Sequence, residues 1–373
     1  MINKLRQRHS DYWLSLAVFG LIVFGLIMIY SVSKYDSLDI THGATDKLYL
    51  KQQLSSLLIG ICAWIAFQAI NYQFYKKYLG HLFFITLGLL LLPLILRPFN
   101  ITVGGRWIVI AGINFQPAEL AKLTFVIYLS GMFAKYDKNL KDIAKLFWPF
   151  ITIVAAIATI MLIQKDLGTL AIFVVIASVI FIFAGAPLYQ LVAATGSGAF
   201  LLWLAIKIEP YRMQRLTTFL NPGSDTSSSG YHIQNALIAI GSGGLWGLGF
   251  GQSKQKYLYL PEAHTDSIFA IICEELGMVR SSLVILVFAF IGYRGLLIAR
   301  NAPDTFSRLM AIGITSWLFF QMAINIAAMF SLVPLTGIPL PFISYGGTSL
   351  IVLLSAVGIL TNISKYQVYE TKK

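Results

Sequence analysis

The stretch YWLSLAVFGLIVFGLIMIY, residues 12–30, decides the class of fold. A helix needs roughly 20 apolar residues to cross the hydrocarbon core of a bilayer, and this run contains no charged side chain. Basic residues precede it, but it is long enough to span and is not followed by the small-residue cleavage site of a signal peptide. We therefore interpret residues 12–32 as a first membrane helix.

The rest of the chain repeats this apolar pattern. Of its 373 residues, 57% are hydrophobic and 12% are charged, which leaves too little polar surface to cover a globule of this size. The sequence predicts an all-α integral membrane protein, with one domain over residues 1–373. Ten membrane helices are expected, at residues 12–32, 50–70, 78–96, 117–134, 146–164, 168–184, 187–207, 279–299, 307–330 and 347–363.

The basic residues predict the orientation of these helices. The formal net charge is +12, which in a soluble protein would suggest a nucleic-acid partner. Here the Lys and Arg residues stand at the ends of apolar runs, as they do in membrane proteins. If the N-terminus is cytoplasmic, the cytoplasmic segments carry more than twice as many Lys and Arg residues as the opposite short loops. The positive-inside rule thus predicts two cytoplasmic termini, and no nucleic-acid partner is expected.

One outer loop, residues 208–266 between the seventh and eighth spans, differs from the others in length. It contains the glycine-rich stretch GSGGLWGLGFG, residues 241–251, and enough apolar and aromatic residues to predict a structured, functional loop. The apolar region that follows is longer than one crossing needs and contains Glu274 and Glu275. We expect residues 267–277 to form a re-entrant or interfacial segment beside a wet cavity.

The segment YLPEAHTD, residues 259–266, concentrates polar side chains where this loop meets the membrane. It contains Glu262, His264, Thr265 and Asp266. A carboxylate here can stay ionised, because its reference pKa is about 3.9, and can still reach a substrate whose tail lies in lipid. Asp266 is therefore a candidate general base. The same spacing also fits Asp266 as the N-cap of the next helix.

A second group of candidates lies at membrane depth. The segment QPAELAK, residues 116–122, places Glu119 and Lys122 on one helix face, and Asp166 follows the fifth span. Ionisable groups inside a membrane are costly unless they are paired or face a polar cavity, so they are functional candidates. The alternative is an ion pair that only fixes helix packing, between Lys122 and either Asp166 or Glu119.

Cations on the outer side form a third group, and they suit a phosphate or pyrophosphate headgroup. They are Arg106, Arg212, Arg215, Lys254 and Lys256. For each of them alone, contact with bulk lipid phosphate is the simpler explanation. A fourth group, PLTGIPLPFISYGG at residues 334–347, carries prolines and glycines that interrupt the helix between the last two spans. Irregular backbone at this depth is expected to line a cavity or to be covered by protein.

In this order, QPAELAK, GSGG followed by YLPEAHTD, EELG and TGIPLPFISYGG resemble the signatures of the SEDS family of shape, elongation, division and sporulation proteins. The resemblance covers nearly the whole chain. Within the family, the segment GFGQSKQK, residues 249–256, is more similar to the division members, FtsW, than to the elongation members, RodA.

The resemblance implies a peptidoglycan glycosyltransferase on the outer face of the bacterial cytoplasmic membrane. Its substrate would be lipid II, the undecaprenyl-pyrophosphate-linked disaccharide-pentapeptide. The family's essential aspartate falls on Asp266, which would take the proton from the acceptor GlcNAc 4-hydroxyl in an inverting transfer. The neighbouring polar residues Glu262, His264 and Thr265 are candidates for substrate binding. The outer cations, or a divalent cation such as Mg or Mn, would hold the pyrophosphate.

The resemblance also implies roles inside the membrane and a set of partners. Lys122 would face Asp166, and a cavity would be lined by Glu119, Lys122, Asp166, Ser344, Tyr345, Gly346 and Gly347. The expected partners are a class B penicillin-binding protein, which is a transpeptidase, and regulators of the division or elongation complex.

The chain departs from the family pattern at two positions. Ser267 follows Asp266 where the family usually has Phe, and Lys165 precedes Asp166 where Pro is common. Two other functional classes remain open from the residues alone. One is a lipid II flippase, suggested by the charges at membrane depth, and the other is a non-catalytic division scaffold.

Overall fold

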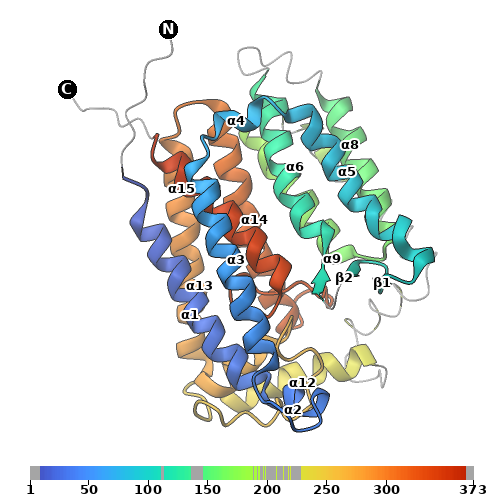
Figure 1. The fold of residues 1–373 in the computed structure, drawn as a ribbon, viewed down its shortest axis with the longest axis vertical. Helices are drawn as coiled ribbons and strands as arrows, with labels where there is room; N and C mark the ends of the chain where they lie inside the picture. Colours follow the sequence, from blue (N-terminus) through green and yellow to red (C-terminus); the bar gives the residue numbers. More distant parts are fainter. Residues whose placement is uncertain are drawn as a thin grey trace.

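The computed structural model describes residues 9–110, 113–135, 146–187 and 228–366, together with single positions between 189 and 219. Figure 1 shows two groups of upright helices that lie side by side. One group contains α1 (Tyr12–Val32), α3 (Leu48–Ala69), α13 (Ile268–Arg300), α14 (Thr305–Met329) and α15 (Gly347–Ser364). The other contains α5 (Leu79–Leu96), α6 (Pro117–Ala134), α8 (Phe147–Ile163) and α9 (Leu167–Phe183). Short helices α2 (Lys34–Ile40) and α4 (Gln73–Lys76) lie in the connections.

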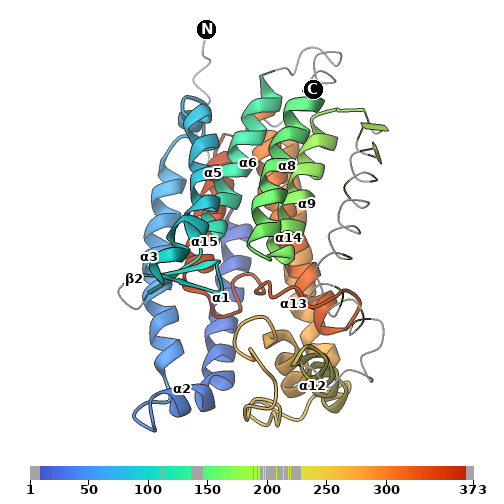
Figure 2. The ribbon, with the colours of Figure 1, turned by 90° about the vertical axis from the view of Figure 1, so that its right-hand side faces the viewer.

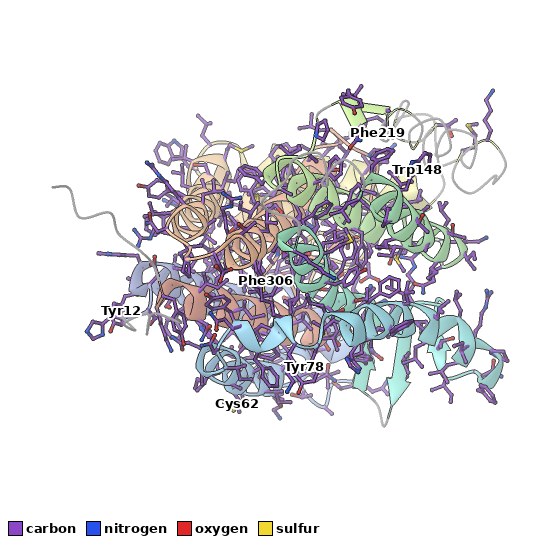
Figure 3. The ribbon with its side chains drawn as sticks, turned by 90° about the horizontal axis from the view of Figure 1, so that it is seen from above. Tyr12, Cys62, Tyr78, Trp148, Phe219 and Phe306 are labelled. Carbon is purple, nitrogen blue, oxygen red and sulfur yellow. The ribbon has the colours of Figure 1, made fainter. Side chains whose placement is uncertain are left out.

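Six helices of the described part are long and apolar enough to cross a membrane: α1, α3, α5 with its extension η1 (Arg97–Phe99), α13, α14 and α15. The apolar helices α8 and α9 are shorter. Large apolar side chains also cover the outside of the bundle. Trp148 is 72% exposed, whereas Phe306 lies fully buried in the interior (Figure 3). Such a surface suits lipid, and the chain is a multi-pass membrane protein.

Most of the predicted spans are found as helices within a few residues of their predicted bounds. The exception is the predicted seventh span, residues 187–207, which lies outside the described residues except at single positions. The predicted eighth span, residues 279–299, is the greater part of α13. Typical residues mark the starts of two helices. The Asp11 carboxylate accepts a hydrogen bond from Leu14 N at the start of α1, and Pro117 is the first residue of α6.

The first and last helices meet at one end of the bundle. The Asp11 amide donates to Ser364 Oγ over 2.9 Å, so the start of α1 lies beside the end of α15. Arg294, near the end of α13, pairs with Asp11 Oδ2 at 2.5 Å. In Figure 1 this end lies at the top, and α2 lies at the opposite end.

A break at Gly277 divides α13 into two helical pieces. Gly277 has φ 80° and ψ 167°, which is not helical. The glycine-rich stretch at residues 241–251 runs along this break. Leu248 N donates to Glu274 O over 3.0 Å, and Met278 N donates to Gly244 O over 2.9 Å. These bonds satisfy backbone groups that the broken helix leaves unpaired.

The described part of the predicted loop at residues 208–266 contains a helix, α12 (Ser228–Gly243). Figures 1 and 2 show α12 lying across the lower end of the bundle, where it packs against α13.

A small sheet follows α5, and the all-α prediction missed it. Its strands are β1 (Thr102–Val103), β2 (Trp107–Ile110) and β3 (Ile113–Phe115), antiparallel in the order β1-β2-β3. Gly104 and Gly105 connect the first two strands with φ values of 60° and 69°. The left-handed region is open to glycine without strain, so the Gly-Gly pair permits the tight turn.

Candidate active site

Asp266 lies two residues before α13 begins and is 9% exposed. The N-cap of α13 is Ser267, and the helix has no side-chain cap, so the alternative role of Asp266 as an N-cap is wrong. Asn325 of α14 fixes the backbone at this point. Its Nδ2 donates to the carbonyl oxygens of Asp266 and Ile338, over 2.7 Å each. A Cβ built on Gly337 would lie 3.9 Å from Asp266 Oδ2, so the carboxylate lies against the segment at residues 334–346.

Two of the other polar residues of the YLPEAHTD segment form one turn beside Asp266. Thr265 Oγ1 donates to Glu262 Oε2 over 2.7 Å, in an exposed position. His264 points elsewhere: its Nδ1 lies 2.9 Å from Asp36 Oδ2 on α2, and its ring centroid is 4.1 Å from that of Tyr49 on α3. His264 therefore links the loop to α2 and α3.

Tyr345 belongs to the same aromatic cluster. Its amide donates to His264 O over 2.9 Å, and its ring meets that of Tyr49 edge-on, with the centroids 4.9 Å apart. Burial raises the pKa of the Tyr345 hydroxyl, which therefore stays protonated and donates to the Gln52 side chain. The segment at residues 334–346 is thus joined to the loop that carries Asp266.

The remaining residues of this segment are held by α3 and open the last helix. Gln53 donates to Ser344 O over 3.3 Å and accepts from Gly346 N over 3.1 Å. Gly346 is the N-cap of α15, and Gly347 is its first residue. A Cβ on Gly347 would lie 2.5 Å from Ser56 Oγ on α3, so close helix packing accounts for glycine there.

Lys122 is buried between α6 and α14 and is 1% exposed. Its Nζ lies 2.8 Å from Glu119 Oε1 and 2.9 Å from Gln321 Oε1, and 4.9 Å from the centroid of the Trp317 ring. Ser349 of α15 donates to the other Glu119 oxygen over 3.1 Å. Of the two predicted pairings, Lys122 with Glu119 is the one that forms.

The expectation that Lys122 faces Asp166 is wrong, because Asp166 is engaged at the start of α9. Its carboxylate accepts from Thr169 N over 3.1 Å and from Thr169 Oγ1 over 2.9 Å, which caps the helix. Arg106 also approaches this carboxylate, with Nη1 3.8 Å from Asp166 Oδ1. Lys165, which precedes Asp166, has φ 59°.

Among the predicted outer cations that the structure describes, Lys256 is buried and Lys254 is exposed. Lys256 is 4% exposed, and its Nζ lies 2.9 Å from Glu275 Oε1 and 3.3 Å from Ser31 Oγ. This buried ion pair speaks against the predicted contact of Lys256 with substrate, whereas Lys254 is exposed. Two of the predicted cations, Arg212 and Arg215, lie outside the described residues.

The described residues do not fit a Mg or Mn site built from protein ligands alone. Nowhere in this part of the chain do three or more His, Cys, Asp or Glu side chains gather. Divalent cations of this kind prefer several oxygen ligands.

Several residues that organise the site were not expected from the sequence. Asn325 and Gln321 are polar residues within the apolar helix α14. Both side chains are buried, and both donate hydrogen bonds to loop carbonyl oxygens. Polar side chains in a membrane helix are costly unless they are satisfied, and this was the signal that could have identified them. Asp36 and Tyr49 carried no such local signal, because their contacts with His264 join distant parts of the chain.

Known proteins match this chain along almost its whole length. Residues 12–369 match the FtsW/RodA/SpoVE family of cell cycle proteins. The chain is 37% identical over 371 residues to stage V sporulation protein E of Bacillus subtilis, covering 98% of this chain and 99% of that protein. It is 36% identical over 372 residues to a probable peptidoglycan glycosyltransferase FtsW of Coxiella burnetii, covering 97% of each.

Solved structures show the same fold. A chain from a study of polymerization and crosslinking by a peptidoglycan synthase complex superposes with a TM-score of 0.78 at 23% identity, covering 95% of this chain and 97% of that one. Thermus thermophilus RodA superposes with a TM-score of 0.67 at 24% identity, covering 96% and 98%. The motifs, the match over residues 12–369 and the shared fold show that this chain belongs to the SEDS (FtsW/RodA/SpoVE) family of peptidoglycan glycosyltransferases.

Proposed function

We propose that this chain polymerises lipid II into glycan strands and that Asp266 is the general base. The acceptor GlcNAc 4-hydroxyl gives its proton to Asp266 while its oxygen attacks the MurNAc anomeric carbon of the growing chain. The bond from that carbon to the diphosphate breaks, and undecaprenyl diphosphate leaves. A single displacement turns the α-linked donor into a β linkage, which requires a base and no covalent sugar–enzyme intermediate.

The observation that carries this proposal is the fixed position of Asp266. Asn325 ties its backbone to Ile338, and Gly337 leaves room beside its carboxylate. A general base is effective only if it is held in a defined orientation, and these contacts hold the backbone of Asp266 in place. The exposed pair of Thr265 and Glu262 next to Asp266 gives a headgroup polar contacts from the water side.

The proposal includes an orientation in the membrane. With ten spans and two cytoplasmic termini, the loop at residues 208–266 and the re-entrant segment at residues 267–277 are extracytoplasmic. Two observations support it: the distribution of Lys and Arg, and the position of α2 and α12 at the end of the bundle opposite the Asp11–Ser364 contact (Figure 1). The active site then opens on the outer face of the bacterial cytoplasmic membrane.

The decisive variant is Asp266→Asn, which keeps the shape of the side chain but cannot accept the proton. We expect no glycan polymer from purified protein and lipid II, with thermal stability and lipid II binding unchanged. The matched control is Asp39→Asn, because Asp39 is an exposed acid on α2 at the same end of the molecule. Polymerisation by Asp266→Asn at the parental rate would refute the base assignment.

The two rival functions give different results with the same protein. A flippase moves headgroups across reconstituted vesicles that carry lipid II only in the inner leaflet, without making polymer. If the protein is only a scaffold, the Asp266→Asn variant still supports growth of cells that are depleted of the parent protein. The contacts of Lys122 with Glu119 and Gln321 favour a packing role over a transport path, because the buried charge is already satisfied.

The proposed partner is a class B penicillin-binding protein, and the proposed process is septal synthesis. The fold of a chain from a peptidoglycan synthase complex supports the partner, and the segment at residues 249–256 supports the division role. Polymerisation by the purified protein, with and without such a transpeptidase, tests the partnership. A rate unaffected by the transpeptidase would contradict it.

A further inference from the structure

A pocket of about 320 Å³ lies where α5 and α8 end. Its lining includes three cations that come from separate parts of the chain. Arg97 belongs to η1, Arg106 follows the Gly104–Gly105 turn, and Lys165 stands between α8 and α9. Of these three, only Arg106 was expected from the sequence to bind phosphate. The volume lies within the range of small-molecule sites.

Specific backbone conformations bring these cations together. Lys165 has φ 59°, in the left-handed region that residues other than glycine seldom adopt. Arg106 Nη2 donates to the Lys165 carbonyl over 2.9 Å, which connects the β1–β2 turn to the junction of α8 and α9. A Cβ on Gly104 or Gly105 would meet nothing within 4 Å, so their positive φ values, and not crowding, account for glycine in this turn.

The charge of the pocket favours an anion. The described lining contains three cations and no Asp or Glu. Next to the lining, Asp166 Oδ1 lies 3.8 Å from Arg106 Nη1. Arginine presents several N–H donors in a plane and binds phosphate oxygens in pairs, whereas lysine adds a point charge. Three such groups around one opening suit a phosphate or diphosphate group.

The start of α9, two residues after the pocket residue Lys165, packs closely against the segment at residues 334–346. A Cβ on Gly168, two residues after Asp166, would lie 2.5 Å from the Thr336 carbonyl oxygen. The next residue, Gly337, is the one whose Cβ would lie 3.9 Å from Asp266 Oδ2. The segment at residues 334–346 therefore packs against the start of α9 at Thr336 and lies beside Asp266 at Gly337.

We propose that the pocket formed by Arg97, Arg106 and Lys165 binds the phosphate groups of a membrane lipid, namely the diphosphate of the polyprenyl-linked substrate or product. The identity of the lipid rests on the proposed function, whereas the affinity for phosphate rests on the pocket alone. In this arrangement the sugar end reaches toward Asp266 while the diphosphate stays among the three cations.

Binding measurements with two neutral variants test the proposal. Arg97→Gln removes one charge, and Lys165→Asn removes another at a position where Asn tolerates the left-handed backbone. Lys47→Asn is the control, since Lys47 is an exposed lysine next to α3 and outside the pocket. The full chain in detergent is titrated with undecaprenyl diphosphate, with phosphatidylglycerol and with inorganic pyrophosphate, and thermal unfolding confirms that each variant is folded.

We expect each pocket variant to bind undecaprenyl diphosphate at least about tenfold more weakly, because one charge-assisted contact is lost, while the control binds like the parent. If the variants bind undecaprenyl diphosphate and pyrophosphate more weakly but bind phosphatidylglycerol like the parent, the result supports a substrate subsite. Equal weakening of phosphatidylglycerol supports a phosphate site but refutes the substrate role. Parental affinity for all three probes overturns the proposal.

The test is separate from that of the catalytic base. In lipid II polymerisation the pocket variants should raise KM with little change in kcat, whereas Asp266→Asn should abolish kcat. If the pocket proposal fails, the KM of the variants stays parental and the effect of Asp266→Asn is untouched. If the proposed function fails, pyrophosphate binding still reports on the pocket.

Discussion

The break in α13 predicts a large effect of one added methyl group at Gly277. Its φ of 80° and ψ of 167° fall in a region that is essentially restricted to glycine, and another residue there costs roughly 1–3 kcal/mol. A Cβ would also lie 2.5 Å from the Leu245 carbonyl oxygen and would overlap the backbone of the glycine-rich stretch. Overpacking of this kind costs about 1–3 kcal/mol. Gly277→Ala should therefore destabilise the protein by roughly 2–6 kcal/mol.

The same helix supplies a matched control. Gly292 lies in the helical part of α13, and the nearest atom to its Cβ would be Phe319 Cδ2 at an ordinary 3.6 Å. Gly292→Ala should be neutral or stabilising by about 0.5–1 kcal/mol, because alanine loses less backbone entropy in a helix.

Thermal unfolding of the purified proteins in one detergent measures the difference, and lipid II polymerisation shows whether the site survives. We expect a clearly lower melting temperature and reduced polymerisation for Gly277→Ala only. If Gly277→Ala melted at or above the temperature of Gly292→Ala, the steric account of the break would be wrong.

Two further substitutions separate positioning, packing and substrate contact. Asn325→Leu removes both hydrogen bonds to loop carbonyls, each worth about 1 kcal/mol, and should lower kcat by about tenfold or more with little change in KM. Steady-state kinetics checks this, and a raised KM with parental kcat would contradict the positioning role. Lys256→Met leaves Glu275 buried and unpaired, and should lower stability by roughly 3–5 kcal/mol in thermal unfolding. Adding Glu275→Gln to Lys256→Met should restore part of the lost stability. If Lys256→Met instead raised KM and kept the parental stability, Lys256 would be a substrate-binding residue.

Local sequence was sufficient for most of the membrane helices that the structure describes. The bounds of α1 and α6 follow from apolar length, from the N-cap Asp11 of α1 and from Pro117, the first residue of α6. These signals act within one or two turns of helix. The break near Gly277 was also foreseen in part, because the apolar region was too long for one crossing. The short strands of the sheet were missed, since strands of two to four residues carry almost no periodic signal.

The partners of the charged residues were decided only by the tertiary structure. The sequence could place Lys122, Asp166 and Lys256 near the membrane and could name Asp266 through family motifs. It did not show that Lys122 pairs with Glu119, that Asp166 meets Arg106, or that Lys256 is buried against Glu275. Hydropathy depends on neighbours in sequence and so determines which segments enter the membrane. Ion pairs depend on distances between segments far apart in the chain, and only the packing of the helices sets those distances.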